Sequence, residues 1–328
     1  MNTINTKEKN MKTLKNGKLV VALVMALSMF FGVSKESQAA FSNEDAGTDT
    51  AQFLKLPVGA KAIGMGGAAT ALADDANAIY YNPAGIARLE KRSAEYMFSK
   101  YIEETSYHWV AVAMPISEQY GAAGIGIQYF TAGSLDETDV RATRLGDFNP
   151  SDLAVNLSYA HKIFGAENSA GINLKIINSK IKESASAFAV DLGVQSQRYM
   201  EGKLLLGFAV QNLGTKLKFE QKSESLPLQI RLGSGYKIQD NWSTGLDVLF
   251  PEDSSPVVAL GTDYKLVLEN EMSVSGRAGY NSTARKVDGL NGITIGVGFG
   301  FQSYTLDYAW QPLGDLGSTH RISLGAKF

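Results

Sequence analysis

The chain has no cysteine, only three histidines among 328 residues, and no excess of basic charge. The lack of cysteine excludes disulfide bridges, thiolate metal sites and a lipid-modified cysteine, and it suits an exported protein. Lysine and arginine number 31 against 33 aspartate and glutamate residues. Because nucleic-acid binding needs a basic footprint, this charge balance argues against a nucleic-acid partner.

A single long apolar run, residues 19–33, follows a lysine-rich start and precedes small residues that end at Ala39. The run is short for a spanning helix, and its flanks are typical of a secretory signal peptide. We expect residues 1–39 to be a signal peptide cleaved after Ala39; the alternative is an uncleaved anchor. Cleavage removes six basic and two acidic residues, which leaves 25 and 31 and a net charge of −6.

From Ser93 onward, segments of about ten residues alternate apolar side chains with small or polar ones. Ile293 and Ile295, for example, flank Thr294. This period of two directs the two sets of side chains to opposite faces of a sheet. About ten residues, tilted by about 45°, also match the length of a strand that crosses a bilayer. We therefore expect residues 93–328 to form an all-β fold, a transmembrane antiparallel β-barrel of about 14 strands.

Fourteen strands are predicted, and this count is held to within two. They centre on residues 93–100, 105–114, 120–130, 152–162, 168–178, 186–195, 203–212, 227–237, 241–249, 257–265, 271–280, 292–301, 303–310 and 319–328. Short turns alternate with longer connections between them. Outer-membrane barrels have short periplasmic turns and long external loops, so both ends of the barrel chain are expected in the periplasm.

Charged residues of these segments fall on the stripe opposite the apolar one: Lys175, Asp191, Arg231, Asp247, Asp263, Arg277, Asp307 and Arg321. An arginine at the bilayer midplane costs about 2–4 kcal/mol, so three would cost about 6–12 kcal/mol. That rivals the stability of a typical domain, about 5–15 kcal/mol. The charged stripe should therefore face the lumen, either lining a water-filled path or pairing internally to clamp a plug. A soluble sandwich, with the apolar stripe buried between two sheets, is the alternative fold.

Aromatic residues near the segment ends are predicted to form interfacial girdles. They are Tyr101, Tyr107, Trp109, Tyr129, Tyr236, Trp242, Tyr264, Tyr280, Tyr304 and Trp310. The last segment ends on Phe328, which shares one stripe with Ile322, Leu324 and Ala326. This ending resembles the terminal signal by which bacterial outer-membrane barrels are recognised for insertion.

Residues 40–92 break the alternation and are rich in glycine and alanine. Small side chains let backbone approach backbone closely, so we expect this stretch to form a hatch, or plug, inside the lumen. One short helix, broken at Pro83, is predicted between Asn77 and Ala87. The candidate hatch and gating residues are Gly66, Gly67, Asp74, Asp75, Asn82, Pro83 and Ala84.

These motifs carry a family resemblance. Gly66-Gly67-Ala68, then residues 73–78, then Tyr81-Asn82-Pro83-Ala84-Gly85 resemble the hatch of FadL-type outer-membrane transporters. Within that superfamily, Ala46-Gly47-Thr48 followed by residues 53–62 is more similar to the PorV/PorQ family. The resemblance implies a fourteen-stranded barrel plugged from the periplasmic side, surrounded by outer-membrane lipid and without a cofactor.

The resemblance also implies two kinds of function. PorV/PorQ members serve type IX protein secretion and surface attachment, with secretion-machinery proteins as partners. FadL-type members carry hydrophobic molecules such as long-chain fatty acids, and Asn82-Pro83-Ala84 matches a hatch motif that reorganises. A structural barrel without traffic is a third possibility.

Other patterns in the sequence would suggest an enzyme or a nucleotide-binding protein, but they fit those functions poorly. Residues 64–69 spell G-x-G-x-x-A, but no βαβ pattern surrounds them and the following acids come too early for dinucleotide binding. The three histidines lack metal-ligand spacing. Asp74-Asp75 is either a carboxylate dyad or, as we favour, a helix cap or solvated pair. We expect a non-enzymatic protein with no catalytic residue and no metal.

Overall fold

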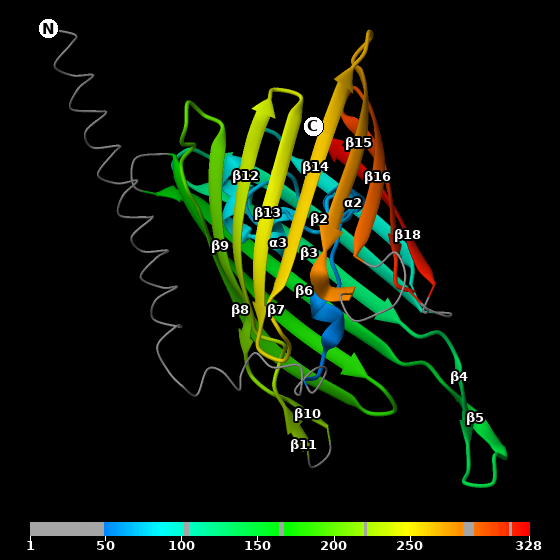
Figure 1. The fold of residues 1–328 in the computed structure, drawn as a ribbon. Helices are drawn as coiled ribbons and strands as arrows, with labels where there is room; N and C mark the ends of the chain where they lie inside the picture. Colours follow the sequence, from blue (N-terminus) through cyan, green and yellow to red (C-terminus); the bar gives the residue numbers. More distant parts are fainter. Residues whose placement is uncertain (1–48, 102–104, 164–166, 220–221, 285–291, 315–316) are drawn as a thin grey trace, which may run out of the picture.

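The computed structural model describes residues 49–101, 105–163, 167–219, 222–284, 292–314 and 317–328. The predicted signal peptide and the motif Ala46-Gly47-Thr48 lie outside the described residues. Fourteen antiparallel strands close into one barrel, in which each strand pairs with its neighbours in chain order (Figure 1). The barrel strands are β1 (Ser93–Lys100), β2 (Ser106–Ser117), β3 (Gly121–Thr131), β6 (Ser151–Ile163), β7 (Asn168–Lys180), β8 (Ser184–Gln195), β9 (Leu204–Gly214), β12 (Gln229–Gln239), β13 (Trp242–Pro251), β14 (Val257–Val267), β15 (Met272–Asn281), β16 (Ile293–Phe301), β17 (Tyr304–Pro312) and β18 (Ser318–Lys327).

The predicted fold is confirmed, since each of the fourteen predicted segments coincides with one barrel strand. The barrel closes where β1 pairs with β18, with Ser93 opposite Lys327. Both chain ends of the barrel therefore lie at the same edge. A closed sheet has no unpaired edge, which is the condition for a strand structure to cross a membrane.

The alternation along each strand separates an outer face from a luminal face. In β7 the outward side chains of Leu174 and Ile176 are 49% and 47% exposed, whereas Lys175 between them is 2% exposed. Such an apolar outer wall, with its charges inside, is what a bilayer requires.

Three girdle predictions are wrong. The ring of Tyr101 lies against the guanidinium of the buried, luminal Arg321. Tyr107 and Trp109 point into the lumen and are buried. They are accommodated there because the segment that precedes the barrel offers them apolar contacts.

The two ends of the barrel differ. At one end, called the long-loop end, the connections after β3 and β9 contain further hairpins that the sequence had not predicted: β4 (Leu135–Thr138) with β5 (Arg144–Phe148), and β10 (Leu217–Phe219) with β11 (Lys222–Glu224). Both hairpins project from the lower end of the barrel in Figure 1. The opposite end, called the short-turn end, holds the start of β1 and the end of β18.

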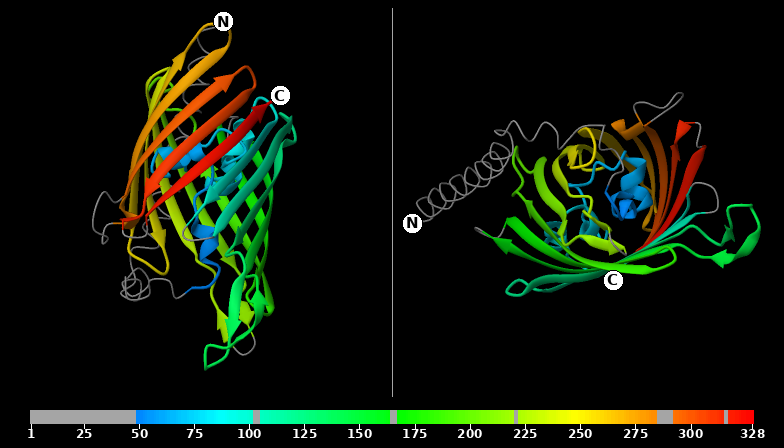
Figure 2. Two further views of the ribbon diagram at one scale, coloured as in Figure 1. Left: turned by 90° about the vertical axis from the view of Figure 1, so that its right-hand side faces the viewer. Right: turned by 90° about the horizontal axis from the view of Figure 1, so that it is seen from below.

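Among the described residues, the helices lie before the first strand, apart from η5 (Ser282–Ala284). They are η3 (Gln52–Lys55), α2 (Ala60–Gly64), α3 (Ala78–Tyr81) and η4 (Pro83–Arg88). The predicted break at Pro83 separates α3 from η4, because Asn82 is extended and proline has no amide hydrogen for a helical bond. Seen along the barrel, this part of the chain lies within the ring of strands (Figure 2). None of the helices in the described part of the chain has the length and apolar character needed to span a membrane.

Candidate functional site: the luminal segment and its contacts

Residues 49–92, here called the luminal segment, cross the barrel from one end to the other. At the long-loop end, Lys55 of η3 forms an ion pair of 2.7 Å with Asp253, whose side chain is 1% exposed. At the short-turn end, Arg88 donates a hydrogen bond of 3.0 Å to the carbonyl of Glu167. The segment is thus attached to the wall at both ends before it enters β1.

Glycines of the wall allow the luminal segment to lie directly on the strands. A Cβ atom added at Gly279 or Gly261 would come closer than 3 Å to the backbone of Met65. The same holds on other strands, where added Cβ atoms would meet the segment at Gly171, Gly193, Gly207, Gly233 and Gly245. Seven of the 33 glycines thus line the track that the segment follows.

A buried ion pair holds the middle of the segment. Asp247 of β13 accepts hydrogen bonds from the amides of Ala69 and Thr70 and from the Thr70 hydroxyl, at 3.1, 3.0 and 2.6 Å. Arg231 of β12 donates to Asp247 at 3.1 Å, to the Thr70 hydroxyl at 2.9 Å and to the carbonyl of Gly67 at 3.0 Å. The two side chains are 4% and 1% exposed. This arrangement favours the clamp interpretation over a water-filled path at this position.

Gly66 and Gly67 turn the chain between α2 and this clamp. Their φ angles are +68° and +84°, a left-handed conformation that favours glycine. The amide of Gly66 donates to the Thr294 hydroxyl at 2.9 Å, and its carbonyl accepts from the Asn281 side chain at 2.8 Å. Both glycines therefore serve the geometry of the segment.

The Asn82-Pro83-Ala84 motif lies against the wall at β7 and β8. The Asn82 side chain accepts from the Ala84 amide at 3.2 Å, which caps η4. It also donates to the carbonyls of Thr70 and Val194, at 3.0 and 3.1 Å. One amide group thus joins the wall, η4 and the turn held by the clamp, so a movement of any of the three would disturb the others.

Asp74 and Asp75 engage different partners. The Lys61 ammonium group lies 3.0 Å from Asp74 and 3.9 Å from Asp75, and Asp75 also accepts from the amide of Asn77 at 2.9 Å. Burial would raise the pKa of the Asp74 carboxyl, but Lys61 and then Lys327 attract its charged form and hold that pKa below its usual range. Asp74 in turn raises the pKa of Lys61. The pair stays charged at neutral pH, and a capping and pairing role fits better than a shared-proton dyad.

The remaining predicted luminal charges are mostly paired. Lys175 lies 2.8 Å from Asp191, and both are buried. Arg277 bridges two strands, with its guanidinium 2.6 Å from Asp263 and 2.5 Å from Asp307. The pairs of Lys175 with Asp191 and of Arg277 with Asp263 join neighbouring strands, and the pair of Arg277 with Asp307 spans β16. All of them keep charge out of the lipid-facing surface.

Arg321 is the exception. Among the described residues it forms no ion pair; its Nη1 donates to the Gln311 side chain at 2.7 Å and to the Thr319 hydroxyl at 2.8 Å. Its guanidinium lies over the ring of Tyr101, 5.7 Å from the centroid. Neutral acceptors and an aromatic face thus take the place that a carboxylate holds at the other luminal cations.

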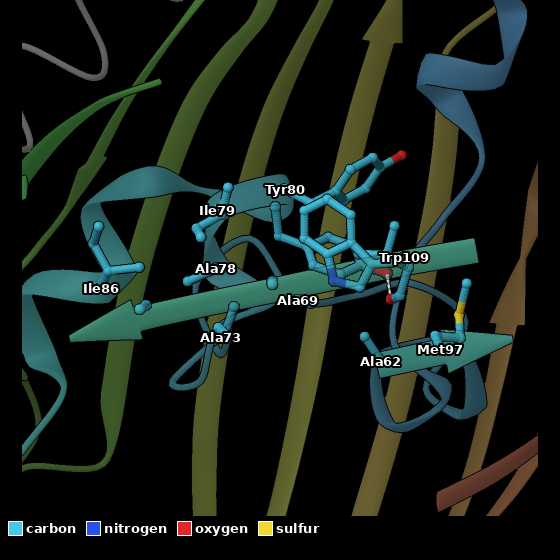
Figure 3. Packing of buried hydrophobic residues seen from close by; sticks show 14 of the residues in the cluster. Ala62, Ala69, Ala73, Ala78, Ile79, Tyr80, Ile86, Met97 and Trp109 are labelled. Atoms are coloured by element: carbon cyan, nitrogen blue, oxygen red, sulfur yellow. Dashed lines mark hydrogen bonds between the residues drawn. The ribbon is translucent and has the colours of Figure 1, made fainter. Parts of the chain in front are cut away.

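An aromatic cluster between the segment and β2 was missed at the sequence level. The rings of Tyr80 and Trp109 meet edge to face at 6.4 Å (Figure 3). The Trp109 indole N–H donates to the Asn77 side chain at 2.9 Å. Met97 and Ile79 belong to the same buried cluster. The large residues on both faces of β2 were the one available signal that this strand packs on both sides.

The carboxy-terminal residue is tied to the start of β1. The amide of Phe328 donates to the carbonyl of Arg92 and the amide of Arg92 to the carbonyl of Phe328, each at 3.0 Å. The side chains of Phe328, Leu324 and Ile322 are exposed on the outer wall. The stripe expected of an insertion signal is therefore present on the lipid side.

No group of histidine, aspartate or glutamate side chains within the described ranges is placed to hold a metal ion. The G-x-G-x-x-A run lies at the end of α2 and in the turn after it, and the element before α2 is the short helix η3. A dinucleotide fingerprint requires a strand before it, so the run belongs to the packing of the segment.

A family model matches residues 39–246, which include the luminal segment and the wall from β1 into β13. Its description is "Type IX secretion system protein PorV", and the match covers more than half of the 328 residues. The chain belongs to the PorV family. A search among curated proteins finds no match.

Solved structures show which fold this PorV-family chain shares. The Pseudomonas putida toluene transporter TodX is similar at a TM-score of 0.56 and 8% identity, over 82% of this chain and 97% of that one. The Ralstonia pickettii toluene transporter TbuX gives 0.53 and 12%, over 83% and 98%. A Pseudomonas aeruginosa FadL homologue gives 0.54 and 14%, over 81% and 97%. At these identities the likeness concerns the fold alone, and it confirms the expected FadL-like outer-membrane barrel.

Proposed function

We propose that this PorV-family barrel is a non-enzymatic outer-membrane component that assists protein secretion or surface attachment of the type IX kind. The family model matches the luminal segment, the first eight barrel strands and the start of β13, and this match carries the proposal. The clamp of Arg231 and Asp247 on Thr70 supports it, because a segment held by a buried ion pair suits a plugged scaffold better than an open pore. On this proposal the hairpins of the long-loop end face the cell exterior.

Deletion of the gene tests the proposal. We expect a set of proteins to disappear from the cell surface and to accumulate in the periplasm, and we expect the wild-type gene to restore them. Mass spectrometry of surface-shaved and periplasmic fractions measures both. An unchanged surface proteome, in cells whose other outer-membrane barrels are present at normal amounts, would refute a secretion role.

A channel for hydrophobic small molecules, such as long-chain fatty acids, is the second candidate. It is favoured by the apolar cluster of Ile79, Tyr80 and Trp109 beside the wall and by the position of Asn82-Pro83-Ala84 against β7 and β8. This candidate predicts a co-purifying hydrophobic ligand in native mass spectrometry. It also predicts slower uptake with Pro83→Ala, because the variant relaxes the turn between α3 and η4. Uptake that is equal in the variant and the wild type counts against the channel.

The orientation of the barrel can be tested by thiol labelling, because the chain has no cysteine of its own. Val140, in the β4–β5 hairpin, and Lys203, at the short-turn end, are both exposed. We expect Val140→Cys to react with a membrane-impermeant maleimide on whole cells and Lys203→Cys to react only after the outer membrane is permeabilised. The opposite pattern would reverse the assignment of the two ends.

A further inference from the structure

Three basic side chains lie side by side on the outer wall near the long-loop end. Lys100 of β1 is directly opposite His320 of β18 in the strand register. On the other side of β1, His108 of β2 is opposite Phe98, the next outward residue from Lys100. Directly opposite residues in an antiparallel pair, such as Lys100 and His320, have Cβ atoms about 5 Å apart, whereas His108 is a diagonal neighbour of Lys100 at about 7–8 Å, still within reach of a long side chain. We call Lys100, His108 and His320 the basic collar.

The collar faces outward. Lys100 and His320 are exposed, whereas the residues beside them in the chain, Ser99 and Arg321, are buried on the luminal side. The other outward residues on these strands are apolar or aromatic, apart from serines at the strand ends such as Ser106 and Ser318. The collar therefore lies at the lipid-facing surface, near the rim of the barrel.

The two imidazoles are held in the same way. The Tyr96 hydroxyl lies 3.2 Å from Nδ1 of His108, and the Tyr308 hydroxyl lies 2.6 Å from Nδ1 of His320. When a tyrosine hydroxyl donates to Nδ1, the neutral ring carries its proton on Nε2, which then serves as a donor. The same tyrosine–histidine pair thus occurs on each side of Lys100. Nε2 of His320 also lies 3.4 Å from the Ser318 hydroxyl, a long contact that a phosphate oxygen would have to replace.

The outward positions of the described strands β17, β18, β1, β2 and β3 contain no aspartate and no glutamate. Basic side chains on a lipid-facing wall are tolerated near the interface, where the penalty for a cation is small. There the phosphate groups of anionic lipids attract them, and both ammonium and imidazole N–H groups are suitable donors to phosphate oxygens.

We propose that Lys100, His108 and His320 bind the phosphate group of an anionic lipid in the leaflet at the long-loop end. The neighbouring rings of Tyr129 and Trp310 lie beside His108 and His320 in the register and would pack against the lipid's glycerol or sugar and upper acyl chains. The proposal is independent of what the barrel secretes or transports. It assigns a lipid-binding site to one sector of the wall, from β17 to β3.

The test uses the purified full-length barrel in nanodiscs of phosphatidylcholine to which phosphatidate or diacylglycerol is added, two lipids that differ by the phosphate group. Native mass spectrometry measures the lipid retained on the barrel. We expect the wild type to retain phosphatidate in preference to diacylglycerol. We expect K100Q/H108Q/H320Q to bind phosphatidate at least about tenfold more weakly, since the variant loses the Lys100 cation and the N–H donors of both imidazoles.

Lys180→Gln is the matched control, because Lys180 is an exposed lysine at the end of β7 and outside the collar sector. It should retain phosphatidate as the wild type does, and heat-modifiable migration in gels verifies that each variant is folded. Equal retention by the triple variant and the wild type would overturn the proposal. So would equal retention of diacylglycerol, or displacement of phosphatidate by millimolar inorganic phosphate, which would show a site for free phosphate rather than for a lipid.

Discussion

Replacement of Asp247 with alanine is expected to weaken the docking of the luminal segment by about 3–5 kcal/mol, the usual result of leaving one member of a buried ion pair alone. The variant removes the acceptor of the Ala69 and Thr70 amides and of the Thr70 hydroxyl. It also leaves Arg231, 4% exposed, with no carboxylate within reach among the described residues. The segment should then lose its central attachment while both of its ends remain bound.

Single-channel recording in planar bilayers measures this effect. We expect the wild-type barrel to stay closed and Asp247→Ala to show frequent open events, together with faster proteolysis near Thr70. Asp240→Ala is the control, since Asp240 is exposed in the short turn between β12 and β13. Arg231→Met combined with Asp247→Leu should be less open than Asp247→Ala alone, because no unpaired charge remains. Equal conductance in wild type and Asp247→Ala would show that the clamp does not hold the plug.

Gly279→Val is expected to expel part of the luminal segment from the barrel. The added side chain would overlap the backbone of Met65 and Gly66, and backbone cannot move aside as a flexible side chain can. Insertion of extra methylene groups into a packed interior costs about 1–3 kcal/mol, and overlap with backbone should exceed that range. The strands themselves should still pair, because valine favours the β conformation.

Gly276→Val on the same strand is the matched control, since a Cβ atom added at Gly276 has no neighbouring atom within 4 Å. Both variants should migrate as folded barrels in unheated gels. Only Gly279→Val should lower the thermal unfolding midpoint by several degrees and increase the hydrogen exchange of residues 60–70. If the two variants behave alike, the segment does not rest on the wall as described.

The positions and faces of the strands could be predicted because their signal is local. In β16 the alternation of Ile293, Thr294 and Ile295 sets which side chain points outward, whatever lies elsewhere in the chain. The cost of exposing arginine to lipid then assigns the charged face to the lumen. For the same reason the membrane class and the approximate strand count followed from the sequence, and the luminal position of Arg231 and Arg277 did as well.

Contacts within the lumen could not be predicted in the same way. Nothing near Thr70 in the chain indicates that Asp247, 177 positions away, binds it. The inward position of Trp109 was missed because large residues occur on both faces of β2, so alternation has no preferred direction there. Arg321 fell on the predicted stripe like Arg277, yet the residue opposite it on β17 is Ala309, whereas Asp307 of the same strand lies opposite Ser323 and pairs with Arg277.

The local sequence pattern was thus enough to predict the features that depend on a single segment and the solvent around it. These are the barrel, its apolar wall, its polar interior and the break at Pro83. Closure of the sheet brought together groups from strands far apart in the chain, and with them the clamp at Thr70, the track of glycines and the basic collar. Each of these features needs residues of several strands to be aligned with one another, and that alignment is set only when the whole ring of strands has closed.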